Sequence, residues 1–265
     1  MRELAERASH ALCLALGRLL RAARYSRTRI VVADGECHVR KERLFYAAPL
    51  IQLSGPLVDL LDTGVRVLRR RDWQDRELRV YQSLYGLTAR ADPDGTLILP
   101  CLPGETLAAL LERAELDELL RRKAVELAAV ALAELHRNGL THGDAMADNV
   151  LVDLDAGVAR WFDFETAHDA RRSMQWRRAD DVRALLATCL LRTTPERFAE
   201  TIDCVLVAYR ENDISDLVAS SVSTSLRRPL VFHLGQAPLS FRRFRDMHRL
   251  LLERRLRARG SHTAP

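Results

Sequence analysis

Hydrophobic and polar residues alternate in short stretches through the first part of the chain, and helical spacing replaces this alternation after about residue 100. The clearest alternating stretches, residues 28–33 and 36–40, flank the dipeptide Asp34-Gly35. This dipeptide favours a tight turn because both residue types tolerate positive backbone φ angles. The pattern therefore predicts a β-hairpin near the start of the chain.

Further elements follow from the same two periods, which are two residues for strands and about 3.6 for helices. Further strands are predicted at residues 65–69, 87–90, 96–99, 149–153 and 159–163. Helices are predicted at residues 2–24, 72–85, 117–138 and 240–259. Most of the remaining chain after residue 100 is also helical in pattern, whereas residues 44–64 fit neither period.

The order of these elements predicts an α+β protein, with a small strand-rich part followed by a larger helical part. We expect a helical extension over residues 1–27, the strand-rich part over 28–100 and the helical part over 101–265. A chain of 265 residues is long enough for such an arrangement. Its composition, 48% hydrophobic and 29% charged, excludes disordered and repetitive classes.

The sequence carries no clear signal for membrane insertion, export or cross-linking. No apolar run reaches the ~20 residues of a membrane span, and Glu3 and Glu6 stand where a leader peptide would be basic. The five cysteines are odd in number and widely spaced, which indicates neither a disulfide framework nor a zinc site. We therefore expect a protein of the reducing cytoplasm.

The excess positive charge behind the net charge of +5 lies in one segment near the end of the given sequence. Residues 240–259 contain eight arginines against Asp246 and Glu253, a net of +6, so the rest of the chain carries −1. Such a basic amphipathic helix could lie on an anionic membrane surface or face an acidic substrate. The alternative is a terminal helix whose apolar side packs on the protein. No nucleic-acid-binding motif is present, and we expect no such partner.

The residues with most chemical potential lie in one short segment. His142-Gly143-Asp144 lies in the loop after a long apolar helix, Asn149 opens a strand, and Asp163 ends the next strand. Two carboxylates and one amide therefore converge on one small hairpin. This set suits phosphoryl transfer: one carboxylate orients the attacking hydroxyl, and the other, with the amide oxygen, holds Mg²⁺ on nucleotide phosphates.

These motifs resemble the protein-kinase-like superfamily. Residues 142–144 with Asn149 resemble its catalytic loop, and Asp163-Phe164-Glu165 resembles its metal-binding triplet. Glycine at position 143, in place of arginine, is similar to the lipopolysaccharide kinase and aminoglycoside phosphotransferase branches. The resemblance implies a bilobal fold, ATP and Mg²⁺ as cofactors, Asp144 as the catalytic residue, and Asn149 and Asp163 as metal ligands.

The resemblance also implies residues that bind the base and support the catalytic loop. The hinge backbone, at Cys101 and Leu102, would pair with adenine, because Pro100 has no N–H to donate. His142 and Asp181 would support the loop. As a residue type, Asp181 could equally cap the helix that follows it.

The phosphate-binding lysine of such folds lies on a first-lobe strand and pairs with a glutamate on the next helix. The chain has two lysines, and Lys123 precedes the catalytic loop in the second lobe. Lys41 with Glu77 is therefore the implied pair, although either residue could be a solvated surface charge. An arginine from 69–71 is a competitor for Lys41, and residues 44–71 would be an insertion. The turn at residues 33–36 lacks the usual glycine-rich phosphate loop.

Together these features predict an ATP- and Mg²⁺-dependent kinase acting on a hydroxyl of a sugar or lipid-linked sugar, like the lipopolysaccharide core kinases. Only 17 residues separate Asp163 from Asp181, which leaves little room for a peptide-docking segment. One alternative is a small-molecule kinase of the aminoglycoside type. Another is a catalytically dead kinase fold that serves as a binding module. The expected location is cytoplasmic, at the inner face of the cell membrane; the oligomeric state is left open.

Overall fold

The computed structural model describes residues 25–33, 35–47, 64–224 and 238–260, together with the single positions 11 and 49. The helix expected at residues 2–24, most of segment 44–64 and Asp34 of the first turn lie outside the described residues. Gly35 has a φ of 80°, the left-handed conformation that the predicted hairpin turn requires.

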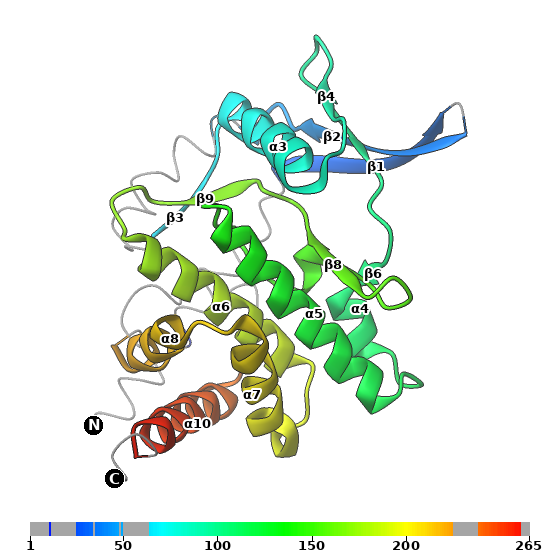
Figure 1. Cartoon of the computed structure of the whole chain (residues 1–265). Helices are drawn as coiled ribbons and strands as arrows, with labels where there is room; N and C mark the ends of the chain where they lie inside the picture. Colours follow the sequence, from blue (N-terminus) through cyan, green and yellow to red (C-terminus); the bar gives the residue numbers. More distant parts are fainter. Residues whose placement is uncertain are drawn as a thin grey trace.

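A four-stranded antiparallel sheet, ordered β1-β2-β5-β4, forms one end of the molecule (Figure 1). Its strands are β1 (Ser26–Ala33), β2 (Glu36–Arg43), β4 (Arg90–Ala91) and β5 (Leu97–Pro100). Both predicted hairpins are present. Helix α3 (Arg70–Tyr85) packs against this sheet through Trp73 and Tyr81, which form a small core with Leu97 and Leu99.

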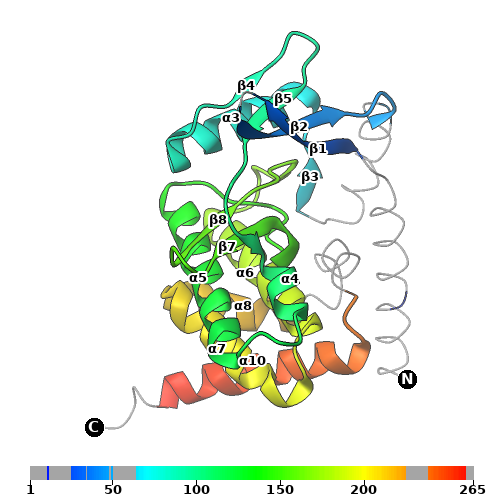
Figure 2. The same ribbon diagram turned by 90° about the vertical axis from the view of Figure 1, so that its right-hand side faces the viewer.

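After β5 the chain runs through residues 101–104 into the helical part of the molecule (Figure 2). The next elements are β6 (Glu105–Thr106), α4 (Leu107–Glu112) and α5 (Glu118–Arg137). Asp117 caps α5, because its side chain accepts a hydrogen bond from the N–H of Leu119. Ala128 and Leu132 are fully buried, so α5 runs through the main core, as its apolar sequence predicts.

Short strands connect the two parts of the molecule around the predicted active-site motifs. They are β3 (Val65–Val67), β7 (Val150–Asp153), β8 (Val158–Trp161) and β9 (Thr166–His168), with the 3-10 turn η1 (Ala147–Asn149) before β7. Strands β6, β7 and β8 form one sheet, whereas β3 pairs with β9 and not with the first sheet. A three-residue strand carries too few positions to reveal its partner in the sequence.

Four further helices complete the core. They are α6 (Met174–Leu191), α7 (Phe198–Tyr209), which follows the 3-10 turn η2 (Pro195–Arg197), α8 (Asn212–Thr224) and α10 (Phe241–Gly260). Helix α10 lies at the end of the molecule opposite the four-stranded sheet (Figure 1). Its apolar residues Phe244, Met247 and Leu251 are buried in the main core, which is the packing alternative named above. Arg254 pairs with Asp203 of α7 at 2.6 Å.

The strand-rich first part and the helical second part confirm the predicted α+β class and agree with a kinase-like fold. Among the described residues, no helix combines the length and the apolar character that crossing a membrane would require.

Candidate active site

The catalytic-loop motif leaves the C-terminal end of α5 and lies between the two parts of the molecule. The side-chain amide of Asn149 donates to two oxygens of Asp144, the backbone carbonyl at 2.9 Å and the carboxylate Oδ2 at 3.0 Å. Both amide protons of Asn149 are therefore directed at Asp144. The Oδ1 atom is then the part of Asn149 that can act as a metal ligand.

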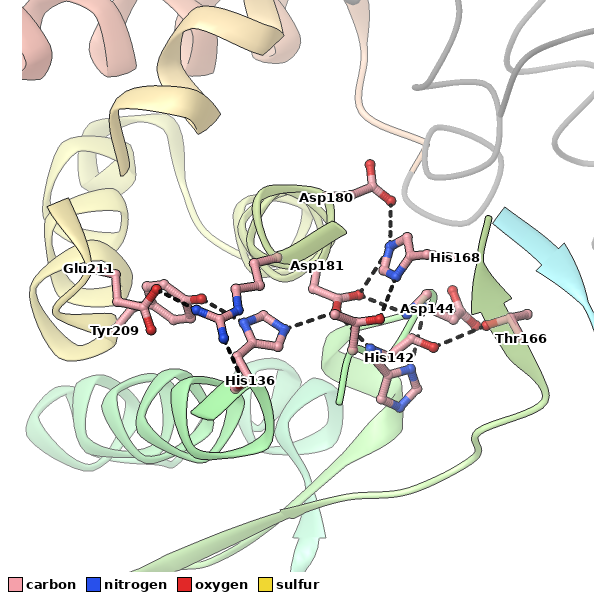
Figure 3. A network of polar contacts seen from close by, with 12 residues as sticks. His136, His142, Asp144, Thr166, His168, Asp180, Asp181, Tyr209 and Glu211 are labelled. Atoms are coloured by element: carbon pink, nitrogen blue, oxygen red, sulfur yellow. Dashed lines mark hydrogen bonds and ion pairs between the residues drawn. The ribbon is translucent and has the colours of Figure 1, made fainter. Parts of the chain in front are cut away.

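Asp181, in α6, joins the loop backbone through buried hydrogen bonds (Figure 3). Its carboxylate accepts the backbone N–H groups of His142 at 2.7 Å and Gly143 at 2.8 Å. It also contacts Nε2 of His136 at 3.0 Å. Burial alone would raise the pKa of Asp181, but His168 and His136 outweigh it and hold the pKa at about 2. The carboxylate is therefore ionised, and its two hydrogen bonds are suited to holding the loop backbone in place. The first turn of α6 is capped by Ser173, so Asp181 is not the N-cap.

His142 is held in one neutral form. Its Nε2 lies 2.9 Å from the carbonyl oxygen of Phe162, which can only accept, so Nε2 carries the proton. Its Nδ1 accepts the backbone N–H of Asp144 at 3.3 Å. Burial lowers the pKa of His142 to about 4, in agreement with a neutral ring. The imidazole therefore orients the backbone on both sides of the site.

Gly143 packs tightly against β9. A Cβ atom there would lie 3.1 Å from Oγ1 of Thr166 and 3.3 Å from the backbone of Ala167, and its φ is 84°. Strand β9 therefore occupies the space next to the loop. A side chain at position 143 would require Thr166 and Ala167 to shift by a few tenths of an ångström, and the positive φ would add backbone strain.

Asp163 follows β8 and sits beside the catalytic loop. The N–H of Phe162 donates to the carbonyl oxygen of Asn149 at 3.0 Å, so the two predicted metal ligands come from adjacent chain segments. Asp163 has a φ of 67°, and among the described non-glycine residues it shares a positive φ only with Arg210. Such a conformation costs free energy and persists only where neighbouring contacts hold it.

Lys41 is buried between two carboxylates. Its Nζ lies 2.5 Å from Oε1 of Glu77 and 2.6 Å from Oδ1 of Asp163. Burial alone would lower the pKa of Lys41, but Asp163 and Glu77 outweigh burial and raise it above its ordinary value. Lys41 lowers the pKa of Asp163 in turn, although burial opposes this. The ammonium and the Asp163 carboxylate are therefore both charged.

Helix α3 carries the groups that complete this arrangement. Glu77 is fully buried and also accepts Nε1–H of Trp73 and the backbone N–H of Phe164, at 3.3 and 3.2 Å. Arg76 donates to the carbonyl oxygen of Thr141 in the catalytic loop. The competing arginines at positions 69–71 are exposed at the start of α3, so the geometry favours Lys41.

The hinge differs from expectation, because Cys37 and Cys101 form a disulfide bond. The expectation of no disulfide was wrong, since the pairing of His38 with Pro100 brings cysteines 64 residues apart in sequence side by side. The N–H of Cys101 also donates to the carbonyl oxygen of Cys37 at 3.1 Å. Cys101 can therefore offer an adenine base only its carbonyl oxygen. The next backbone N–H that could donate to the base is that of Leu102. The argument for a reducing compartment no longer holds.

The first turn does not reach the predicted phosphate site. Gly35 lies six residues from Lys41 along β2, which corresponds to about 20 Å of extended chain. The turn therefore cannot take the place of a glycine-rich loop over the phosphates.

One charged residue at the site, Arg43, was not identified from the sequence, and Glu165 was named only as the third residue of the triplet, without a partner. Arg43 lies two residues after Lys41 and binds Glu165, which lies two residues after Asp163. The sequence did contain a signal for this pair: the two cations on the strand and the two carboxylates in the triplet are both two residues apart.

Residues 101–205 match the model of the Lipopolysaccharide kinase (Kdo/WaaP) family. This segment is that of a protein-kinase-like superfamily member. The matched residues include the predicted catalytic loop, the predicted metal triplet and Asp181, and the match confirms the predicted resemblance. Because the named family is one of kinases, the match supports a kinase. No curated protein matches the chain significantly.

The neutral state of His142 predicts a pH dependence of stability. The unfolded chain binds this proton near pH 6.5, whereas the folded chain does so only near pH 4. His142 therefore makes its full contribution to the free energy of unfolding above pH 6.5. As the pH falls from 6.5 to 4, this contribution decreases by about 1.4 kcal/mol per pH unit. Chemical unfolding of wild type and His142→Asn across this range measures the difference. Parallel curves for the two proteins would contradict the assignment.

The disulfide predicts a dependence of stability on reductant. Reduction should lower the free energy of unfolding by about 2–4 kcal/mol, because the unfolded chain regains the freedom of a long loop. The Cys37→Ser variant should have the reduced stability and should no longer respond to reductant. Alkylation of the denatured, unreduced chain should label Cys189 and Cys204 but neither Cys37 nor Cys101. Labelling of all five cysteines would show that the bond does not form.

Proposed function

We propose that this protein is an ATP- and Mg²⁺-dependent phosphotransferase that phosphorylates a hydroxyl group of a sugar or a lipid-linked sugar. The observation that carries the proposal is the convergence of Lys41, Glu77, Asp144, Asn149 and Asp163 on one site, from β2, α3 and the two sides of the β7–β8 hairpin. The family match to residues 101–205 supports the same class of chemistry.

In this proposal each residue has a separate task. Lys41 contacts the nucleotide phosphates, and Glu77 holds its ammonium in place. Asp163 and Asn149 would hold magnesium, since an ionised carboxylate and an amide oxygen are ligands that this ion prefers. When bound, magnesium neutralises charge on the phosphates. Asp144 orients the acceptor hydroxyl and accepts its proton. Most of the rate enhancement then comes from alignment and preorganised charge.

Base recognition in this proposal uses the hinge and the face of the sheet that carries Lys41. Val39 lies on the same face of β2 as Lys41, and Ile30 is its partner across the sheet. Ile30 is 72% exposed, so it offers apolar surface next to the hinge for an adenine ring. The carbonyl oxygen of Cys101 and the N–H of Leu102 would supply the polar contacts.

A small acceptor suits the segment after Asp163. Strand β9 pairs with β3, and Gly143 packs directly against β9. The segment is therefore already ordered by backbone hydrogen bonds, and position 143 offers no arginine to bind an activating phosphate. Both features favour a sugar hydroxyl over a protein side chain.

The proposal does not extend to membrane insertion by α10. Phe244, Met247 and Leu251 of α10 are buried in the core, so insertion would have to rely on Leu256, which is 70% exposed, beside exposed arginines such as Arg242 and Arg257. We leave this contact outside the proposed function.

The role of Asp144 can be tested with a nearly isosteric substitution. Asp144→Asn should lower phosphate transfer from Mg²⁺-ATP to dephosphorylated core oligosaccharide by about 10²- to 10⁴-fold. Nucleotide binding, measured by thermal shift, should persist. Asp155→Asn, in the exposed β7–β8 turn, is the matched control and should retain full activity.

Three outcomes would contradict parts of the proposal. Full activity of Asp144→Asn would contradict the role of Asp144. Transfer to aminoglycosides but not to core sugars would indicate a small-molecule kinase. A wild-type protein without any thermal shift at millimolar Mg²⁺-ATP would indicate a binding module without catalysis.

A further inference from the structure

Two cations on β2 bind two carboxylates of the metal triplet in matching register. Lys41 and Arg43 are two residues apart on one strand, so their side chains lie on the same face of the sheet. Asp163 and Glu165 have the same separation. Lys41 binds Asp163 at 2.6 Å, and Nη1 of Arg43 binds Oε2 of Glu165 at 3.2 Å. The Arg43–Glu165 pair therefore lies two residues after the Lys41–Asp163 pair on both segments.

Arg43 is held firmly enough to fix its partner. Its side chain is 5% exposed. Its Nη2 donates to the carbonyl oxygen of Leu68 at 2.9 Å, and its guanidinium lies 4.6 Å from the ring centroid of Trp73. The same indole donates its N–H to Glu77, the partner of Lys41. One aromatic side chain thus contacts both ion pairs, so the position of one is coupled to that of the other.

Glu165 is tied to the same segment by its backbone. Its carbonyl oxygen accepts the N–H of Leu68 at 2.8 Å, and the next residue begins β9, which pairs with β3. The carboxylate and the backbone of Glu165 therefore both anchor the chain directly after Asp163. Asp163, two residues earlier, has a φ of 67°, and such a conformation persists only where neighbouring contacts hold it.

Without Arg43, the arrangement around Lys41 would change. Glu165 is largely buried and is close enough to Lys41 to influence it electrostatically. Without Arg43, Glu165 would keep a hydrogen bond with Ser26 but lose its cationic partner. A buried carboxylate without a cation is costly, so Glu165 would compete with Asp163 for Lys41. Protein kinases carry glycine at this third position of the triplet, and this competition does not arise there.

We propose that Arg43 and Glu165 are positioning residues: their ion pair fixes the loop after β8 so that the carboxylate of Asp163 is presented to Lys41 and to the metal-bound nucleotide. This inference rests on the proposed function, because it assigns a role to Asp163 in binding the Mg²⁺-nucleotide.

The test compares Arg43→Met, Glu165→Gln and the double variant with wild type. Calorimetric titration with ATP, with and without Mg²⁺, gives the factor by which Mg²⁺ improves ATP affinity. Each single variant should reduce this factor by about 10- to 100-fold, the usual effect of losing a residue that orients a metal ligand. The double variant should be no worse than either single variant, because both substitutions remove one interaction.

Arg66→Met is the matched control. Arg66 lies in β3 and binds Asp169, which follows β9 directly, at 3.3 Å, so it joins the same two segments through a surface ion pair away from Asp163. This variant should keep the wild-type response to Mg²⁺. Thermal unfolding of every variant separates lost stability from lost positioning.

Two results would overturn the inference. One is an unchanged effect of Mg²⁺ in both single variants, even if their melting temperatures fall. The other is strictly additive losses in the double variant. Wild-type protein that does not bind Mg²⁺-ATP would instead contradict the proposed function itself. The two failures are therefore distinguishable in one series of titrations.

Discussion

The arrangement of the site depends on one buried ammonium group. Lys41 is 4% exposed and lies between the carboxylates of Glu77, in α3, and Asp163, after β8. A buried charge without a partner is costly, so Lys41 brings the strand, the helix and the triplet together. Removing Lys41 would leave the carboxylates of Glu77 and Asp163 in the interior without this shared cation.

The predicted catalytic loop is held by contacts that do not involve this lysine. Asp181 accepts two consecutive backbone N–H groups of the loop, and His142 connects the loop to the segment before Asp163. Arg76 adds a contact from α3 to the carbonyl oxygen of Thr141. The loop and the Lys41 cluster therefore meet in a geometry set from both parts of the molecule, as catalysis by alignment requires.

The sequence predicted the elements with strong periodic or turn signals, and the structure contains them; most boundaries agree closely, but the strand predicted at 87–90 is observed at Arg90–Ala91. The helix α5, the two hairpins of the first sheet and the β7–β8 hairpin are examples. The pairing of β3 with β9 and the bond between Cys37 and Cys101 were not predicted, because both depend on tertiary proximity of residues far apart in sequence. Charge patterning likewise described α10 as amphipathic but could not decide which surface its apolar side contacts.

We propose that Lys41 is the cation that contacts the nucleotide phosphates. An ATP analogue with an acyl phosphate group transfers its acyl group to a lysine beside the bound phosphates, and this chain has only two lysines. Peptide mass spectrometry after labelling should find acylated Lys41, and excess Mg²⁺-ATP should prevent this modification. Lys123 is exposed on α5 and reports non-specific labelling. Modification of Lys123 alone, or modification of Lys41 that Mg²⁺-ATP does not reduce, would contradict the claim.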